Sequence, residues 1–204
     1  MLGQQIDEMA KQLQLGYTHF VIRTELASTL AKMKDAFDMA PVFFVMTLNS
    51  HRGASILGLT RVLDRDKDCL ALDSISRCLH SNAGCFPRIS AQDVRSVRKQ
   101  FDENATNIRQ RAQKIVKLRD REIAHLNHDL ALGKPKLPNN DNLRPDIEWA
   151  YKEIRNALDE VSEACLGKKK IGSLGPLCCI DFKPLLEAVD DALKAKEREL
   201  ARSR

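Results

Sequence analysis

Aromatic side chains are scarce in this sequence. Phe, Trp and Tyr together make up 5% of the 204 residues, and one Trp is present. Strand-rich folds draw on aromatic and β-branched residues, so this scarcity favours helices. No polar–apolar alternation is long enough to predict a strand, and we find no internal repeat. With 43% hydrophobic and 30% charged residues, the composition supports a folded core rather than disorder.

Long hydrophobic runs are also missing. The most apolar stretch, residues 39–48, is too short to span a membrane. The first fifteen residues carry Asp7, Glu8 and Lys11 and lack the apolar segment of a secretory signal. These two absences predict a cytoplasmic protein that does not insert into membranes.

Several motifs of familiar chemistry are absent. None of the six cysteines forms a C-x-x-C pair, which argues against zinc-ribbon and thioredoxin-like sites. There is no G-x-S-x-G, P-loop or Rossmann glycine pattern, so nucleophilic serine chemistry and those two nucleotide-binding folds find no support. We therefore expect neither a metal nor a cofactor, and we interpret Cys178-Cys179 as a buried pair rather than a redox site.

Helical periodicity is what the sequence does contain. Apolar spacing predicts helices over 6–36, 41–63, 70–80, 90 to at least 126, 145–166, and from about 184 to the end. Pro41 and Pro145 suit a first helical turn. Ser90 and Asp93 have the spacing of a capping box. Charged or Gly/Pro-containing stretches predict connections at 64–68, 81–88, 133–144 and 172–176.

The second of these helices carries two further expectations. Its first half is apolar on nearly every side, which predicts a central place in the core. Gly53 and Gly58 predict a close helix crossing. The helix lengths and short connections indicate an all-α antiparallel bundle, with residues 1–167 as one domain and 168–204 as a C-terminal loop and helix.

The long helix that starts near residue 90 has an apolar stripe that breaks. The stripe steps by three or four through Val94, Val97, Phe101, Ala105, Ile108, Ala112 and Ile115. The same rhythm then reaches Arg119, Glu122 and Leu126, so a core-facing stripe becomes charged for two turns. Charge in a core is costly unless it is paired, which predicts either a structural ion pair or a functional cleft or interface.

Positive charge is concentrated on this helix. Residues 95–121 hold nine basic and three acidic residues, an excess larger than the net charge of +5 on the whole chain. Such a helix suits a phosphate backbone, although a solvated helix face has the same composition. The candidate RNA-binding residues are Arg109, Arg111, Lys114 and Lys117.

These residues resemble a known family. Arg119-Asp120-x-x-x-x-His125 is similar to the R-x(4–6)-H motif of the HEPN superfamily of helical proteins. Ala124-His125 after a basic helix, together with the stretch 59–64 (LTRVLD), resembles the abortive-infection branch of that superfamily. The similarity covers roughly residues 15–165, and it implies a HEPN-like helical bundle.

The resemblance also implies a function. HEPN ribonucleases cleave RNA without a metal, often as toxins or phage-defence proteins, with motifs from two protomers meeting at a dimer interface. Carried over, His125 is the acid–base group, Arg119 clamps the phosphate and Asp120 orients them. RNA, a second copy of the chain and an antitoxin protein are the partners it suggests. The supporting candidates are Arg121, Glu122, Asn127 and His128.

Three alternatives stay open. The first is a non-catalytic module of this fold that binds a nucleotide or a protein. The second is a di-iron-type metal site at Glu122-x-x-His125, but such sites need a second Glu-x-x-His, which the sequence lacks. The third is a structural bundle with an Arg119–Glu122 ion pair and a core histidine at 125. We interpret His19, His51 and His80 as structural or surface residues.

Overall fold

The computed structural model describes residues 1–66, 68–131, 143–168 and 182–202. Within these ranges, side chains are described except at 120–131, 182–183, 197 and 200–202. The regular elements are α1 Leu2–Leu30, α2 Lys34–Met39, α3 Pro41–Leu63, α4 Leu72–Ser81, a 3-10 turn Ala83–Cys85, α5 Ala91–Ala131, α6 Arg144–Val161, a π-helical turn Ser162–Leu166 and α7 Phe182–Arg202. No strand occurs in this part of the chain, which confirms the all-α prediction.

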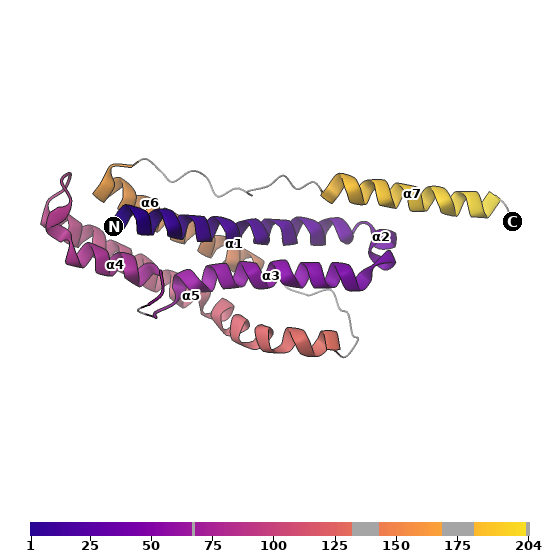
Figure 1. Cartoon of the computed structure of the whole chain (residues 1–204), viewed down its shortest axis with the longest axis horizontal. Helices are drawn as coiled ribbons and strands as arrows, with labels where there is room; N and C mark the ends of the chain where they lie inside the picture. The colour runs from indigo at the N-terminus through magenta and orange to yellow at the C-terminus, as the bar shows by residue number, and fades with distance from the viewer. Residues whose placement is uncertain (67, 132–142, 169–181, 203–204) are drawn as a thin grey trace.

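The helices form an elongated antiparallel bundle (Figure 1). The first pair, α1 and α3, runs side by side for most of the length, and α2 reverses the chain between them. The second pair is α5 with α6, and α4 packs on α5. One apolar core joins all five long elements of this bundle, with Leu13, Leu59, Leu72, Ile115 and Ile154 each fully buried. The basic helix α5 is therefore anchored on the core by its apolar stripe.

A close crossing locks α1, α3 and α6 together. A Cβ atom on Gly58 would lie 3.0 Å from the Cα atom of Gly16, so any larger residue would push the two backbones apart. The Tyr151 hydroxyl fills the space beside it and donates a 2.6 Å hydrogen bond to the Ser55 carbonyl. The crossing predicted for Gly58 is confirmed. The one predicted for Gly53 is wrong, because a Cβ there would meet nothing within 4 Å.

Two other predictions are corrected. The helix expected over 6–36 ends at Leu30, and a tight turn leads into α2. The turn brings the Phe37 ring to 6.3 Å from that of Phe44, a contact that a straight helix would prevent. The first half of α3, expected at the centre of the core, has Phe43 63% and Met46 51% exposed, because it is covered on one side only.

The last helix lies at the α2 end of the bundle. Contacts join α7 to α2 and α1, and Figure 1 shows it extending beyond them. Leu186 packs with Leu26, Leu30 and Leu48 in a small second core. The division of the chain at 167–168 stays a prediction. None of the described helices combines the length and apolar character needed to cross a membrane.

Candidate functional site

Helix α5 starts where its capping box predicts. The Ser90 hydroxyl accepts a 3.1 Å hydrogen bond from the Asp93 amide and lies 2.7 Å from the Asp93 carboxylate. Val94, one residue on, is completely buried, and Ile89 packs against the same core. The start of the helix is thus fixed by local chemistry, and this fixes the register of every later residue on α5.

The apolar stripe fails at the predicted place. Ile108 and Ala112 are buried, and Ile115 has no exposed surface. Leu118 and Arg119, the next residues of the stripe, are only half-buried. The core therefore ends between Ile115 and Arg119, and a guanidinium group takes the position of a core side chain.

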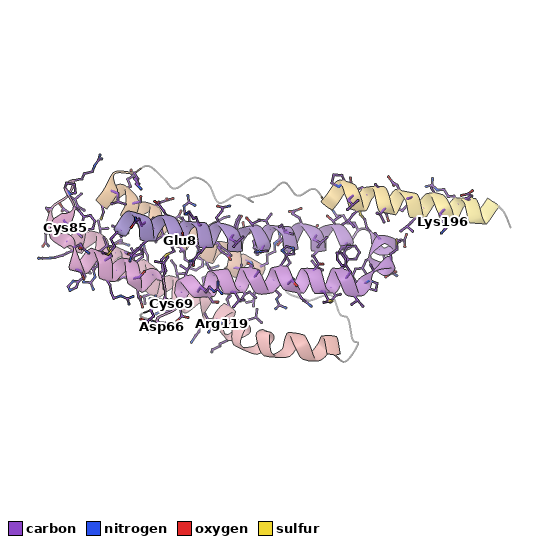
Figure 2. The ribbon with its side chains drawn as sticks, viewed as in Figure 1. Glu8, Asp66, Cys69, Cys85, Arg119 and Lys196 are labelled. Carbon is purple, nitrogen blue, oxygen red and sulfur yellow. The ribbon has the colours of Figure 1, made fainter. Side chains whose placement is uncertain are left out.

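Arg119 lies at a groove between α5 and the end of α3. Figure 2 shows its side chain where α5 passes the connection that follows α3. The groove has a volume of about 560 Å³, and its other wall includes Thr60 and Leu63 of α3 and Arg65 of the connection that follows α3. That volume is within the range of small-molecule sites. The first residue of the predicted motif thus faces solvent-accessible space beside the core.

The remaining motif residues lie outside the described side chains. The backbone stays helical to Ala131, but the side chains of Asp120, Arg121, Glu122, His125, Asn127 and His128 are not among those described. On a regular helix, Arg119 and His125 differ by about 120° in direction, since each residue turns about 100°. Arg121 and His125 share a face. One helix alone does not bring Arg119 and His125 together, and their joint role stays a prediction.

The predicted RNA-binding residues have different surroundings. Arg109 donates to the Asp73 carboxylate at 2.7 Å and to the Leu63 carbonyl at 3.1 Å. Arg111 pairs with Asp146 at 2.9 Å and lies over the Trp149 ring, 4.1 Å from its centroid. These two guanidinium groups hold α5 against α3, α4 and α6. Lys114 and Lys117 are exposed.

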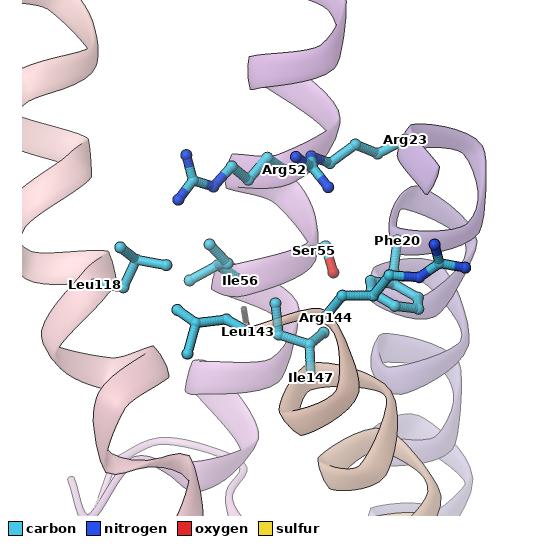
Figure 3. A pocket seen from close by; sticks show the side chains of 9 residues that line it. All are labelled: Phe20, Arg23, Arg52, Ser55, Ile56, Leu118, Leu143, Arg144 and Ile147. Carbon is cyan, nitrogen blue, oxygen red and sulfur yellow. The ribbon is translucent and has the colours of Figure 1, made fainter. Parts of the chain in front are cut away.

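Sequence reasoning missed a second basic cluster, which lies farther along α3 beside Leu118 of α5. A small cavity of about 20 Å³ beside Leu118 is lined by Arg23, Arg52 and Arg144, from α1, α3 and α6 (Figure 3). Arg23 is 8% and Arg52 9% exposed, and Arg52 leaves α3 on the side of α5. Burying two guanidinium groups costs free energy, so this part of the bundle is unusual for a core. The sequence indicates this cluster only through Arg23 and Arg52, each of which lies on an otherwise apolar helix face.

The two histidines next to this cluster contact each other. The Nδ1 atoms of His19 and His51 are 2.8 Å apart, so one ring donates and the other accepts. Burial, and secondarily the neighbouring His19, lower the pKa of His51 below its ordinary value. The pair thus joins α1 to α3, consistent with a structural reading of both residues.

Comparison with known proteins identifies the family. A HEPN-type family model described as AbiU2 matches residues 4–166, most of the chain. The chain belongs to the HEPN AbiU2 family. No curated protein and no solved structure matches. The match confirms the HEPN-like, abortive-infection resemblance, and it includes the whole of α5 with the R-x5-H motif, whereas α7 lies beyond it.

The described part of this HEPN AbiU2 chain also bears on metals and thiols. No group of three or more His, Cys, Asp or Glu side chains among the described residues is arranged to hold a metal, and the side chains of Glu122 and His125 are not among those described. Cys69, Cys78, Cys85 and Cys165 are free thiols. Burial, with a smaller contribution from Cys78, raises the pKa of Cys165. Cys178 and Cys179 lie outside the described residues.

Proposed function

We propose that this chain is a metal-independent endoribonuclease of phage-defence type, acting as a homodimer. The observation that carries the proposal is the replacement of the buried stripe by Arg119 beside an open groove, within a HEPN motif. A functional site is a common reason for a core stripe to accept a charge.

The chemistry needs only these side chains. His125 takes the proton from a ribose 2′-hydroxyl, whose oxygen attacks the adjacent phosphorus; the bond from phosphorus to the 5′-oxygen breaks, and this oxygen takes a proton from water. Arg119 donates hydrogen bonds to the non-bridging oxygens, whose charge increases in the transition state. The products carry a 2′,3′-cyclic phosphate and a 5′-hydroxyl. Asp120 orients the side chain of either His125 or Arg119.

The direct test uses end-labelled RNA in EDTA. We expect the full chain to leave 2′,3′-cyclic phosphate ends, and His125→Ala and Arg119→Ala to lose at least about a hundredfold in rate. Arg95→Ala, an exposed position in the first turns of the same helix, is the matched control and should cleave normally. Cleavage that survives both substitutions would remove the assigned site. Binding without cleavage would favour a non-catalytic RNA-binding module.

The exposed apolar residues of α2 and α3 support the dimer. Val42, Phe43 and Met46 lie on one side of α3 at helical spacing, and Met39 lies at the end of α2; each is more than half exposed, and we call these four residues the open face. The cited contacts between α3 and α5 lie in the second half of α3, at Leu63 with Arg109 and at Ile56 with Leu118, and their order makes the two helices antiparallel. The backbone of α5 beyond Leu118 therefore runs toward the end of α3 that carries the open face, and a second copy there would approach this end of α5.

Mixing two inactive variants tests whether the site is shared. If one site combines Arg119 of one protomer with His125 of the other, a mixed Arg119→Ala/His125→Ala dimer holds one intact site. We expect about a quarter of wild-type activity after subunits exchange, since half the dimers are mixed under two-fold symmetry. No recovery of activity, with subunit exchange confirmed by mass, would place the site in one chain.

A substitution in the open face tests the dimer itself. Phe43→Ser should shift the mass in solution to that of a monomer.

A further inference from the structure

The groove beside Arg119 contains more than a phosphate clamp. Its α5 wall includes two exposed glutamines, Gln110 and Gln113, three residues apart and therefore on one helix face. Val116 and Arg119 continue the α5 wall of the groove, each turned about 60° from the residue three before it. Exposed basic and exposed uncharged side chains are interspersed along the described part of α5, and the uncharged ones that line this groove include these two amides. They form a neutral polar part of the groove wall, and the Arg119 guanidinium group lies farther along the same wall.

The groove supplies two other kinds of contact. Apolar surface comes mainly from the half-buried Val116, because Leu63, at the end of α3, lines the groove but is 5% exposed. Arg65 is exposed in the connection that follows α3. One carboxylate also lines the groove, but Asp64 accepts hydrogen bonds from the amides of Arg65 and Asp66 at 2.7 and 3.1 Å, which ties it to its own turn. The charge that faces the groove is thus mainly positive.

These three features match the parts of one nucleotide. Guanidinium groups bind phosphate and stack on bases. An amide side chain carries both donors and an acceptor, as the edge of a base does. Apolar side chains cover the face of an unstacked base. A volume of about 560 Å³ is enough for a nucleotide.

We infer that this groove is a nucleobase subsite, in which Gln110 and Gln113 read the edge of a base next to the phosphate held by Arg119. The inference rests on the proposed function for that phosphate, and it extends it from RNA in general to RNA with a preferred base beside the cleaved bond. A helix of lysines and arginines alone would bind every sequence equally.

The test measures binding separately from cleavage. His125→Ala protein is titrated with short single-stranded oligoribonucleotides, each of one base, and anisotropy gives the Kd. We expect affinities to differ among the bases by at least about fivefold. Adding Gln110→Leu and Gln113→Leu should flatten that difference while weak, salt-dependent binding remains. Leucine and glutamine have similar helix propensities, so the helix should persist.

Controls separate the subsite from general effects. Gln92→Leu, an exposed glutamine in the first turn of α5, should leave the preference unchanged. Arg119→Ala should weaken all the oligomers by a similar factor. Equal affinities in the parent protein, or a preference that survives the double substitution, would overturn the subsite.

The failure of this inference differs from that of the proposed function. A base preference lost in the glutamine variant, in a protein that never cleaves RNA, would keep the subsite and remove the ribonuclease. RNA cleavage without any base preference would keep the ribonuclease and remove the subsite. A Gln110→Glu, Gln113→Glu pair adds a check, because carboxylates at these positions should repel the backbone and weaken binding of every oligomer.

Discussion

The two halves of α3 are both rich in apolar residues, yet they differ in surroundings. In the second half, Ile56, Leu59 and Val62 are at most 3% exposed. In the first half, only the side facing α1 is buried, at Val45 and Leu48, while Phe43 and Met46 face outward. The difference lies in the neighbours: α1, α5 and α6 surround the second half.

The contrast indicates how stability and function are divided along the bundle. The surrounded half contains the Gly16–Gly58 crossing and the buried Tyr151, where packing tolerates little change. The outward side of the other half is apolar without a covering element among the described residues. A helix that is hydrophobic all round is normally buried, so this side suits a partner. Stability should therefore depend on one half and association on the other.

The largest contrast is expected from matched truncations in the two halves. Leu59→Ala removes a side chain with no exposed surface and should lower the free energy of unfolding by about 2–5 kcal/mol. Met46→Ala, at a position 51% exposed, should change it by less than about 1 kcal/mol. Urea unfolding of the purified chains measures both. Equal losses of unfolding free energy in the two variants would contradict the idea that stability depends mainly on the second half of α3.

Repeating these unfolding measurements at several protein concentrations distinguishes the two halves further. If a second copy covers the open face, the Met46→Ala effect should increase with protein concentration, because association stabilises only the folded chain. The Leu59→Ala effect should not depend on concentration through the same contact. A Met46→Ala effect that is independent of concentration would mean that the open face does not hold the dimer together.

Glycine substitutions give the next largest contrast, with opposite signs. A Cβ on Gly16 would collide with the Tyr151 hydroxyl and lie 3.3 Å from the Cα atom of Gly58. Gly16→Ala should therefore cost about 1–3 kcal/mol of stability, since the crossing must open. Gly53→Ala meets nothing within 4 Å and should gain about 0.5–1 kcal/mol from helix propensity. Calorimetric melting of the two variants should move in opposite directions.

Local signals explain the parts of the fold that sequence predicts well. Pro41 starts α3 and Ser90–Asp93 starts α5, because a first turn and a capping box are decided by residues close in the chain. The stripe to Ile115 is predicted for the same reason, since helical periodicity is local. The candidate site was found where this local rule fails, at Arg119.

Features set by distant segments were missed or misplaced. The end of α1 at Leu30 is accompanied by a contact between the rings of Phe37 and Phe44, and no glycine or proline marks it in the sequence. The exposure of Phe43 depends on which helices stop short of the first half of α3. Arg23 and Arg52 approach one cavity only because α1 and α3 run antiparallel. None of these can be derived from spacing along one helix.

The smallest effect concerns His51, where the two halves of α3 meet. Its Nδ1 atom lies 2.8 Å from that of His19, and burial lowers its pKa. Below pH about 6.5 the unfolded chain therefore takes up a proton more readily than the folded one, so stability should fall as pH decreases through that value. Well above pH 6.5, His51 is neutral in both the folded and the unfolded chain and should contribute no slope.

His51→Gln isolates this contribution, because glutamine keeps a donor and an acceptor near His19 but does not titrate. We expect its melting temperature to fall less than that of the wild type between pH 7.5 and 5.5. His80→Gln, an exposed histidine whose Nδ1 lies 2.9 Å from the Arg98 guanidinium, controls for the loss of a histidine elsewhere. If His51→Gln keeps the wild-type slope, protonation at this junction does not loosen α1 from α3. The contact between α1 and α3 at this point would then depend on apolar packing rather than on the charge of His51.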